Sequence, residues 1–232
     1  MFHLVSSLYT QYTKREQYNI LILGLDNAGK TTFLEHTKLL YADVDQQDTT
    51  KSGDVPSKTT SEILKSKRIL PTVGQNVTTI KFDSSTNSST PKNINLKFWD
   101  LGGQRSLRSM WSRYYKSCHG IIFIIDSTDT ERFQECYDTL IEIAHDNAWL
   151  EDGSVSVNVP ILMLANKQDL PQAVDLVSLK TGVFIRLVSE LEATDSKLLP
   201  VSVLENKGLK ESLEWLVTRL VYNKPNRMPE YR

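Results

Sequence analysis

Several features that identify common protein classes are scarce or missing in this chain. It contains two cysteines, Cys118 and Cys136, whose separation fits neither a disulfide framework nor a metal-binding motif, so we interpret both as buried structural thiols. The four histidines are scattered, with no pair at the spacing of metal ligands. The longest apolar runs, at 120–125 and 161–165, have the length of strands and fall far short of the ~18 residues that a membrane-spanning helix needs. No secretory signal pattern is recognisable at the N-terminus, so we expect a protein inside the cell.

The chain also lacks an excess of charge of either sign. Its 27 Lys and Arg residues stand against 28 Asp and Glu, which leaves nothing in the composition to favour nucleic acid or an anionic membrane as a partner. Hydrophobic residues make up 40% and charged residues 24%, ordinary values that exclude wholesale disorder and fibrous repeats. A length of 232 residues is large for one domain and small for two, so we expect one domain with insertions.

Two polar segments and a tail interrupt the globular texture. Residues 44–67 and 83–93 are rich in Ser, Thr, Asn, Asp and Lys, and offer too little apolar surface to offset the entropy of ordering them. We interpret both as solvated insertions. Residues 224–232 contain two prolines and no periodicity, which predicts a flexible tail.

Short apolar runs alternate with amphipathic runs in the rest of the chain. The predicted strands are 19–23, 77–82, 94–99, 120–126, 160–165 and 198–201, and the predicted helices are 32–40, 131–145 and 209–222. Apolar strands separated by helices indicate an α/β fold with a mostly parallel sheet flanked by helices. Only the polar segment 83–93 joins the second and third strands, so we expect that pair to be antiparallel, at one edge of a six-stranded sheet.

The first predicted strand leads directly into GLDNAGKT at 24–31, which fits the phosphate-binding pattern G-x-x-x-x-G-K-[ST]. Glycines let backbone N–H groups wrap a phosphate, and the N-terminus of the following helix adds the positive end of its dipole. Lys30 would reach the β- and γ-phosphates, and Thr31 would bind Mg²⁺. The predicted phosphate-binding residues are Gly24, Asp26, Asn27, Ala28, Gly29, Lys30, Thr31 and Thr32. This motif alone leaves ATPases, kinases and GTPases open.

The tetrapeptide NKQD at 166–169 chooses among these classes. It follows a buried predicted strand, at the carboxyl end where ligands of α/β proteins bind. The carboxylate of Asp169 can accept hydrogen bonds from N1–H and N2–H₂ of guanine, whereas adenine offers no such pair of donors. We therefore expect Asn166, Lys167 and Asp169 to bind guanine, and GTP and GDP to be the ligands.

Two further segments carry the signs of a nucleotide-dependent switch. In WDLGGQ at 99–104, Asp100 is placed to hold Mg²⁺ through water, Gly103 to donate its N–H to a γ-phosphate, and the catalytic candidate Gln104 to orient an attacking water. In PTVGQN at 71–76, the hydroxyl of Thr72 can join Mg²⁺ only when a γ-phosphate is present. Such loops order around GTP and relax after hydrolysis.

Together, GLDNAGKT, PTVGQN, WDLGGQ and NKQD resemble the ADP-ribosylation factor (Arf) family of small GTPases. The resemblance implies the small GTPase fold, an exchange factor, effector proteins, a monomer, and slow hydrolysis without a GTPase-activating protein that supplies an arginine. The stretch LLPVSVL at 198–204 resembles the family's last base-contacting loop, with Ser202 and with Val203 in place of the customary alanine. The implied contact there is a backbone N–H to guanine O6. Segment 44–67 is too small to be the helical domain of a G-protein α subunit.

The N-terminus narrows the resemblance to the Arf-related proteins of the Golgi. Phe2 stands where the myristoylation pattern has glycine, so we expect no lipid anchor of that kind. An apolar helical face is formed by Phe2, Val5, Tyr9 and Tyr12, with Leu4 and Leu8. The predicted docking residues are Met1, Phe2, Leu4, Val5, Leu8 and Tyr9. The resemblance implies that Met1 is acetylated and that this face docks on an integral Golgi membrane receptor, at the cytosolic surface. The alternative is that the helix packs permanently on the domain.

These observations divide the chain into an amphipathic helix at 1–16, a GTPase domain at 17–223 and a tail at 224–232. Two functions stay open. The first is a GTP-hydrolysing switch in Golgi membrane traffic that recruits tethering or sorting proteins. The second is a GTP-binding scaffold with negligible hydrolysis. Among the aromatic residues that Arf proteins present to effectors, Trp99 and Tyr114 are matched and Gln75 replaces a phenylalanine, so we do not assume the effectors of ordinary Arf proteins.

Overall fold

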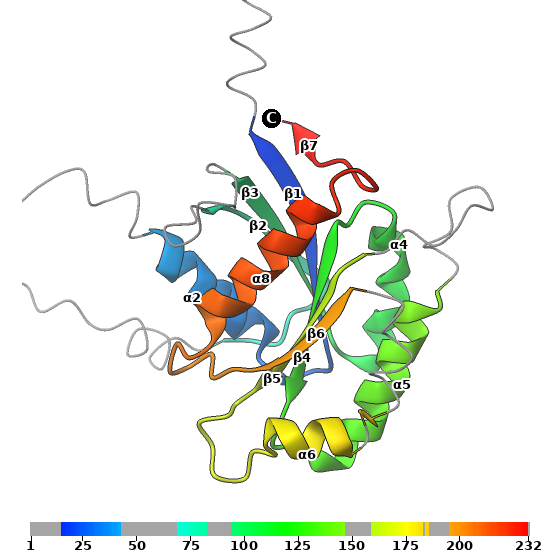
Figure 1. Cartoon of the computed structure of the whole chain (residues 1–232). Helices are drawn as coiled ribbons and strands as arrows, with labels where there is room; N and C mark the ends of the chain where they lie inside the picture. The colour runs from blue at the N-terminus through cyan, green and yellow to red at the C-terminus, as the bar shows by residue number, and fades with distance from the viewer. Residues whose placement is uncertain are drawn as a thin grey trace, which may run out of the picture.

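The computed structural model describes residues 15–42, 69–82, 94–146, 159–182, 184–185 and 195–231. The predicted N-terminal helix, apart from its last two residues, lies outside these ranges, as do both predicted insertions, 44–67 and 83–93. The described residues form one sheet of seven strands with helices on both faces (Figure 1). The strands are β1 (Glu16–Leu23), β2 (Gln75–Phe82), β3 (Ile94–Leu101), β4 (Gly120–Asp126), β5 (Ile161–Asn166), β6 (Ser196–Pro200) and β7 (Glu230–Tyr231).

The strand order is β2-β3-β1-β4-β5-β6, with β7 paired to β1. The pairs β1–β3, β1–β4, β4–β5 and β5–β6 are parallel, and β2–β3 is antiparallel at the edge, as the short connection predicts. The α/β class, the mostly parallel sheet and its antiparallel edge strand are thus confirmed.

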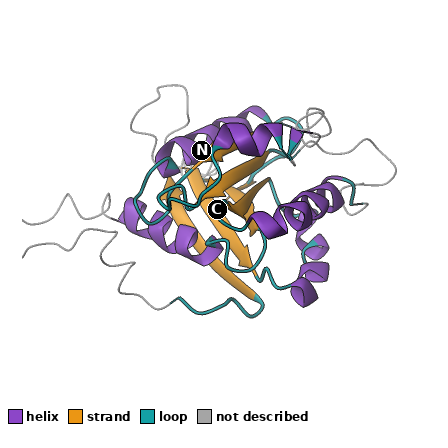
Figure 2. Ribbon diagram, turned by 90° about the horizontal axis from the view of Figure 1, so that it is seen from below, coloured by secondary structure: helices purple, strands orange, loops and turns teal. Residues whose placement is uncertain are grey.

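Helices cover the sheet because its central strands are apolar on both faces. The helical elements are α2 (Lys30–Ala42), η2 (Arg105–Met110), α4 (Ser112–Tyr115), η3 (Thr130–Arg132), α5 (Phe133–Ala144), α6 (Leu176–Thr181) and α8 (Leu209–Tyr222). Along β4, Phe123 packs in one core and Ile124 in the other. The first core includes residues of α4, α5 and α6, and the second those of α2 and α8, so the sheet lies between two helical layers (Figure 2). Cys118 and Cys136 are buried free thiols, as predicted. Within the described ranges, no helix has the length and apolar character needed to cross a membrane.

The C-terminal segment differs from the flexible tail that its composition predicts. β4 runs alongside β1 only from Ile20 onward, which leaves the start of β1 open on that side. There Glu230–Tyr231 forms β7 and pairs antiparallel with β1, so the sheet has seven strands and not the six that were predicted (Figure 1). Glu230 accepts hydrogen bonds from the side chains of Gln17 at 2.9 Å and Asn19 at 2.7 Å. Periodicity could not reveal a two-residue strand whose partner lies at the other end of the sequence.

Candidate nucleotide-binding site

A cavity of about 360 Å³ opens at the carboxyl ends of β1, β3 and β5, where the loops that follow these strands meet. Most of the predicted nucleotide-binding residues line it: Asp26, Asn27, Gly29, Lys30, Thr31, Thr32, Thr72, Gly103, Gln104, Asn166, Lys167, Asp169 and Val203. The lining also includes residues that were not predicted, among them Leu70 and Leu170. Of the remaining predicted residues, Asp100 and Ser202 are buried directly behind the wall and bond to lining side chains.

The phosphate loop, residues 24–31, adopts a conformation that depends on glycine. Gly24 has φ +136°, and a Cβ there would lie 2.3 Å from the carbonyl oxygen of Ile124. Gly29 has φ +100°, and its Cβ would lie 2.5 Å from the side-chain nitrogen of Asn166. Asn27, with φ 63°, is a residue type that tolerates the left-handed region. The loop therefore turns sharply into α2, whose N-terminus faces the cavity.

Lys30 lies at the start of α2 and is almost fully buried. Its ammonium group donates a hydrogen bond to the carbonyl oxygen of Leu25 at 2.7 Å. Burial lowers the pKa of Lys30 to about 8, although the carboxylates of Asp100 and Asp26 oppose the shift. A phosphate bound in the loop would stabilise the charged form, so this lysine is poised to pair with an anion.

Three predicted metal-binding side chains meet at one point. Thr31 Oγ1 lies 2.8 Å from Thr72 Oγ1 and donates to Asp100 Oδ2 at 2.7 Å, and Thr72 donates to the same oxygen at 3.3 Å. Asp100 is fully buried, and its Oδ1 has no partner among the described residues. Burial raises the pKa of this carboxyl group, against the effects of Thr31, Lys30 and Thr72. An orphaned carboxylate oxygen beside two hydroxyls fits a hard, oxygen-binding cation such as Mg²⁺.

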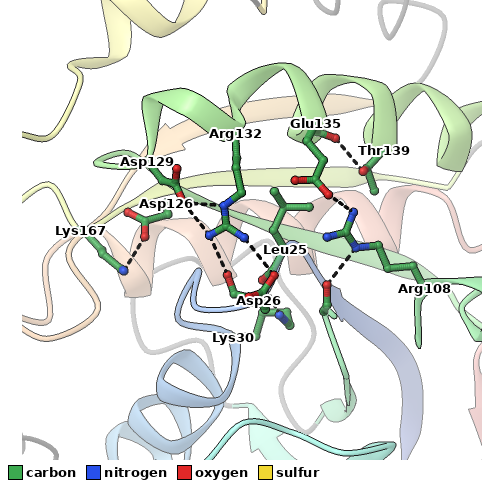
Figure 3. A network of polar contacts seen from close by, with 11 residues as sticks. Leu25, Asp26, Lys30, Arg108, Asp126, Asp129, Arg132, Glu135, Thr139 and Lys167 are labelled. Atoms are coloured by element: carbon green, nitrogen blue, oxygen red, sulfur yellow. Dashed lines mark hydrogen bonds and ion pairs between the residues drawn. The ribbon is translucent and has the colours of Figure 1, made fainter. Parts of the chain in front are cut away.

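Gly103 brings the segment after β3 against the phosphate loop. A Cβ at Gly103 would lie 2.3 Å from Lys30 Nζ and 2.4 Å from the carbonyl oxygen of Gly24, so only glycine fits this approach. The carbonyl oxygen of Gly103 accepts a hydrogen bond from Arg108 at 2.9 Å, and Arg108 is held by Glu135 of α5 at 2.8 Å (Figure 3). Gln104 follows at the cavity wall and is exposed.

The base side of the cavity is built by hydrogen bonds between three loops. Ser202 Oγ donates to Asp169 Oδ1 at 2.6 Å, which orients the carboxylate predicted to read guanine. Asn166, at the start of the loop 166–169, donates to the carbonyl oxygen of Ala28 at 2.9 Å and so connects that loop to the phosphate loop. The N–H of Val203, expected to contact guanine O6, here donates to Asn166 Oδ1 at 3.1 Å. A contact with the base must share or replace that bond.

Lys167, in the left-handed region at φ 65°, pairs with Asp126 at 2.5 Å (Figure 3). Although burial opposes ionisation, Lys167 and Thr128 together lower the pKa of Asp126. The pair joins the loops that follow β4 and β5.

An arginine that sequence reasoning missed contacts the phosphate loop from outside. Arg132, at the end of η3, donates to Asp26 Oδ1 at 2.9 Å and to the Asp26 carbonyl oxygen at 3.3 Å, and also binds Asp129 at 2.6 Å (Figure 3). The sequence offered no sign of an arginine near this loop. In the structure Arg132 holds the loop through Asp26, from a position outside the cavity lining. Only the Asp129–Arg132 spacing was visible in the sequence, as a local i,i+3 pair.

The predicted effector aromatics also come together. The rings of Trp99 and Tyr114 are 5.4 Å apart, and Lys97 lies 4.5 Å above the Trp99 ring. Tyr114 donates a hydrogen bond to Gln75, the residue that departs from the family pattern. The glutamine is therefore a polar partner within the aromatic group.

Comparisons with known proteins agree with this geometry. The sequence model of the ADP-ribosylation factor family matches residues 4–220. The chain is 48% identical to ADP-ribosylation factor-like protein 3 of Saccharomyces cerevisiae, over 100% of both chains. It is 37% identical to ADP-ribosylation factor-related protein 1 of Homo sapiens, over 96% of this chain and 94% of the other.

Among solved structures, the fold is similar to that of the Arl6 BBS3 small GTPase from Trypanosoma brucei with the bound nucleotide analogue GppNp. The TM-score is 0.63 at 22% identity, covering 89% of this chain and 99% of the other. This chain belongs to the ADP-ribosylation factor family of small GTPases, switch proteins that bind GTP, GDP and Mg²⁺ and hydrolyse GTP.

Proposed function

We propose that this GTPase acts as a switch in Golgi membrane traffic, at the cytosolic face of Golgi membranes. Its similarity to an ADP-ribosylation factor-related protein and the apolar sequence at 1–9 support this assignment. Phe2 does not match the glycine of the myristoylation pattern, and six modest apolar residues give weak bilayer affinity alone. The face formed by Met1, Phe2, Leu4, Val5, Leu8 and Tyr9 therefore docks on an integral membrane receptor, with Met1 acetylated.

The cavity residues carry the following roles in this proposal. Lys30 and the amides of the phosphate loop bind the β- and γ-phosphates, and Asp169 accepts from guanine N1–H and N2–H₂. Thr31 and Thr72 would hold Mg²⁺ directly and Asp100 would hold it through water, and the ion would supply positive charge against the phosphates. Gln104 orients the attacking water, and Gly103 donates its N–H to the γ-phosphate.

The main support for a switch is that the Thr72 hydroxyl lies within hydrogen-bond distance of Thr31 and Asp100. Thr72 lies in a segment that contains the exposed apolar residues Leu70 and Val73. A contact made at the metal site therefore fixes the position of an exposed apolar surface. Effector proteins of the GTP state would read this surface together with Trp99 and Tyr114.

The test compares Gln104→Leu, which should hold the GTP state, with Thr31→Asn, which should weaken Mg²⁺ binding and favour GDP. Golgi-enriched membranes are incubated with each full-length variant and with wild type, and bound protein is measured after sedimentation. Gln104→Leu should accumulate on the membranes and Thr31→Asn should stay in the supernatant. Equal partitioning of all three would contradict the proposal.

The N-terminal part of the proposal has its own experiment. Phe2→Ala should abolish sedimentation of the GTP-loaded protein and leave nucleotide binding unchanged, and intact mass of the natively expressed chain should show one acetyl group. Protease-treated membranes should lose binding if the receptor is a protein. Binding that survives on protein-free vesicles would assign the attachment to lipid instead.

A further inference from the structure

His36 is a buried histidine on α2 that no predicted role explains. Its side chain is fully buried, and its Nδ1 donates a hydrogen bond to the carbonyl oxygen of Val203. A carbonyl can only accept, so the ring proton lies on Nδ1. Nε2 is then a bare acceptor, with no partner among the residues that the structure describes. Among the described residues, the ring therefore makes one polar contact, and that contact is to loop 201–205, here called the base loop.

That contact gives the base loop a second hydrogen-bonded link to the phosphate-binding segment. The Asn166 side chain donates to the Ala28 carbonyl oxygen and accepts from the Val203 N–H. His36 of α2, the helix that begins at Lys30, donates to the Val203 carbonyl oxygen. The phosphate side and the base side of the cavity are thus joined twice. One link runs through Asn166 and the other through His36.

The two bonds at Val203 hold the peptide groups on both sides of it. Its N–H belongs to the peptide with Ser202, and its C=O belongs to the peptide with Leu204. Val203 is 2% exposed, so without His36 its carbonyl would lose its protein partner in a place where water has little access. Ser202, the preceding residue, orients Asp169. The position of this loop therefore controls both predicted contacts with guanine.

We propose that His36 is a positioning residue for guanine recognition. It holds the loop 201–205 in the position from which the Val203 N–H can donate to the oxygen at position 6 of the base. The inference rests on the proposed roles of Val203 and Asp169. It adds a residue from the phosphate-binding helix to the determinants of base specificity. His36 touches no substrate; it acts through the Val203 carbonyl group.

The test uses three substitutions of His36 in the full-length protein. Asn places an amide nitrogen where Nδ1 stands, Gln carries the amide one carbon further out, and Leu removes the donor. We expect His36→Asn to release GDP at the wild-type rate, and His36→Gln and His36→Leu to release it on the order of 10-fold faster, the effect of one lost hydrogen bond. Thr37→Val is the matched control, because Thr37 is equally buried but, within the described part of the chain, its hydroxyl donates to the Phe33 carbonyl oxygen of its own helix.

If His36 had only a structural role, its substitution would change stability without changing which base is preferred. Nucleotides with altered bases therefore distinguish a structural role from a positioning role. The preference for GDP over 6-thio-GDP, altered only at position 6, should shrink in His36→Leu and return in His36→Asn. The preference over inosine diphosphate, which lacks the N2 amino group that Asp169 reads, should change less. Wild-type GDP release and wild-type selectivity in His36→Gln and His36→Leu would overturn the proposal, as would failure of His36→Asn to restore either. If His36→Leu does not fold, the contrast between Asn and Gln still decides.

Failure of the underlying assignment gives a different result. If wild type itself binds ADP as tightly as GDP, or if Asp169→Asn leaves the inosine preference unchanged, the proposed base contacts are wrong. If wild type discriminates as expected and only the His36 variants show no effect, the inference about His36 fails alone.

Discussion

The two ends of the sheet use similar polar side chains to opposite effect. At the amino end, Gln17, Asn19 and His119 are buried and bond to the chain's own C-terminal segment, at Glu230 and at the Met228 carbonyl oxygen. At the carboxyl end, comparable groups converge on an open cavity. Among the described residues, Asn19 Oδ1 is the one buried polar side-chain atom at the amino end that has no hydrogen-bond partner. Near the carboxyl end, Asp100 Oδ1 and His36 Nε2 have none.

The difference shows how one fold separates stability from function. Parallel strands direct their carboxyl ends toward the same edge, so the loops that follow β1, β3 and β5 meet there, and each can contribute a group to a shared ligand. The amino end of β1 has only one open side, and β7 fills it. Changes at the carboxyl end should therefore alter nucleotide binding, and changes at the amino end should alter folding.

The largest effect should follow substitution of the base-reading carboxylate. Asp169→Asn replaces an acceptor with a donor, so the preference for GDP over xanthosine diphosphate should fall on the order of 100-fold or more. Competition binding with both nucleotides measures it. Asp175→Asn is the control, since Asp175 caps α6 by accepting from Val177 and Ser178, a role that asparagine also fills. Unchanged selectivity in Asp169→Asn would remove the proposed base contact.

A pair of glycine substitutions contrasts the two ends directly. Gly103→Ala forces a Cβ toward Lys30 Nζ and the Gly24 carbonyl oxygen, so GTP affinity should fall roughly 10-fold or more while GDP affinity changes less. In Gly120→Ala, at the start of β4, the close contacts of the new Cβ are with the flexible side chains of Leu220 at 3.0 Å and Leu216 at 3.3 Å, and the Pro160 carbonyl oxygen lies at an ordinary 3.6 Å. This substitution should cost about 1–3 kcal/mol of unfolding free energy and spare nucleotide affinity. Reversed effects in the two variants would contradict the division between the ends.

Loss of the C-terminal carboxylate should weaken the amino end alone. Glu230→Ala removes the acceptor of the Gln17 amide group and one of the two acceptors of the Asn19 amide group, which keeps the Ser117 carbonyl oxygen. The expected cost is about 1–2 kcal/mol in chemical denaturation. GDP release should not change. Glu205→Ala removes an exposed ion pair with Lys207 and serves as the control, with an expected effect near zero. Equal destabilisation by both variants would show that β7 adds nothing beyond surface charge.

The smallest effect should be a pH dependence at the same end. His119 Nδ1 accepts from the N–H of Asn19, and Nε2 donates to Met228, so the ring is neutral. Burial lowers its pKa below the ordinary 6.5, assisted by Arg227 and opposed by the bond to Met228 and by Glu230. Its contribution to stability is therefore complete above about pH 6.5 and is lost as pH falls through the lower, folded-state pKa.

The slope is at most about 1.4 kcal/mol per pH unit for one such group. His119→Asn should flatten the loss of stability between pH 7 and pH 5, measured by urea denaturation. His36 titrates in the same direction, so its Asn variant is the parallel measurement. A pH profile that His119→Asn leaves unchanged would assign the dependence to other groups.

The parts of the site that could be predicted from sequence are those in which a short segment contains its own chemistry. The stretches at 24–31, 99–104 and 166–169 each follow a strand, and the structure brings them to one cavity as the parallel topology requires. The predicted convergence of Thr31, Thr72 and Asp100 is found in the structure as hydrogen bonds among the three side chains. Their binding of nucleotide and metal stays a prediction.

The residues that were missed act across long stretches of chain. Arg132 contacts Asp26 across 106 residues, His36 contacts Val203 across 167, and Glu230 contacts Gln17 across 213. Each belongs to a helix or tail whose local pattern has an ordinary explanation, so no periodicity or motif distinguishes it. The seventh strand was missed for the same reason, since its two residues form a strand only because β1 offers an unpaired side.

The sequence by itself determined the α/β class, the antiparallel edge and the identity of the nucleotide motifs, because these depend on local hydrophobic period and on residue types at fixed spacing. Only the tertiary structure decided which side chains support the strands and motifs. Arg132 contacts Asp26 of the phosphate loop, Arg108 the Gly103 carbonyl oxygen, His36 the Val203 carbonyl oxygen, and Glu230 the Asn19 side chain at the amino end of β1. A hydrogen bond depends on distance and angle in space. Two residues brought together by folding leave no mark in the sequence between them.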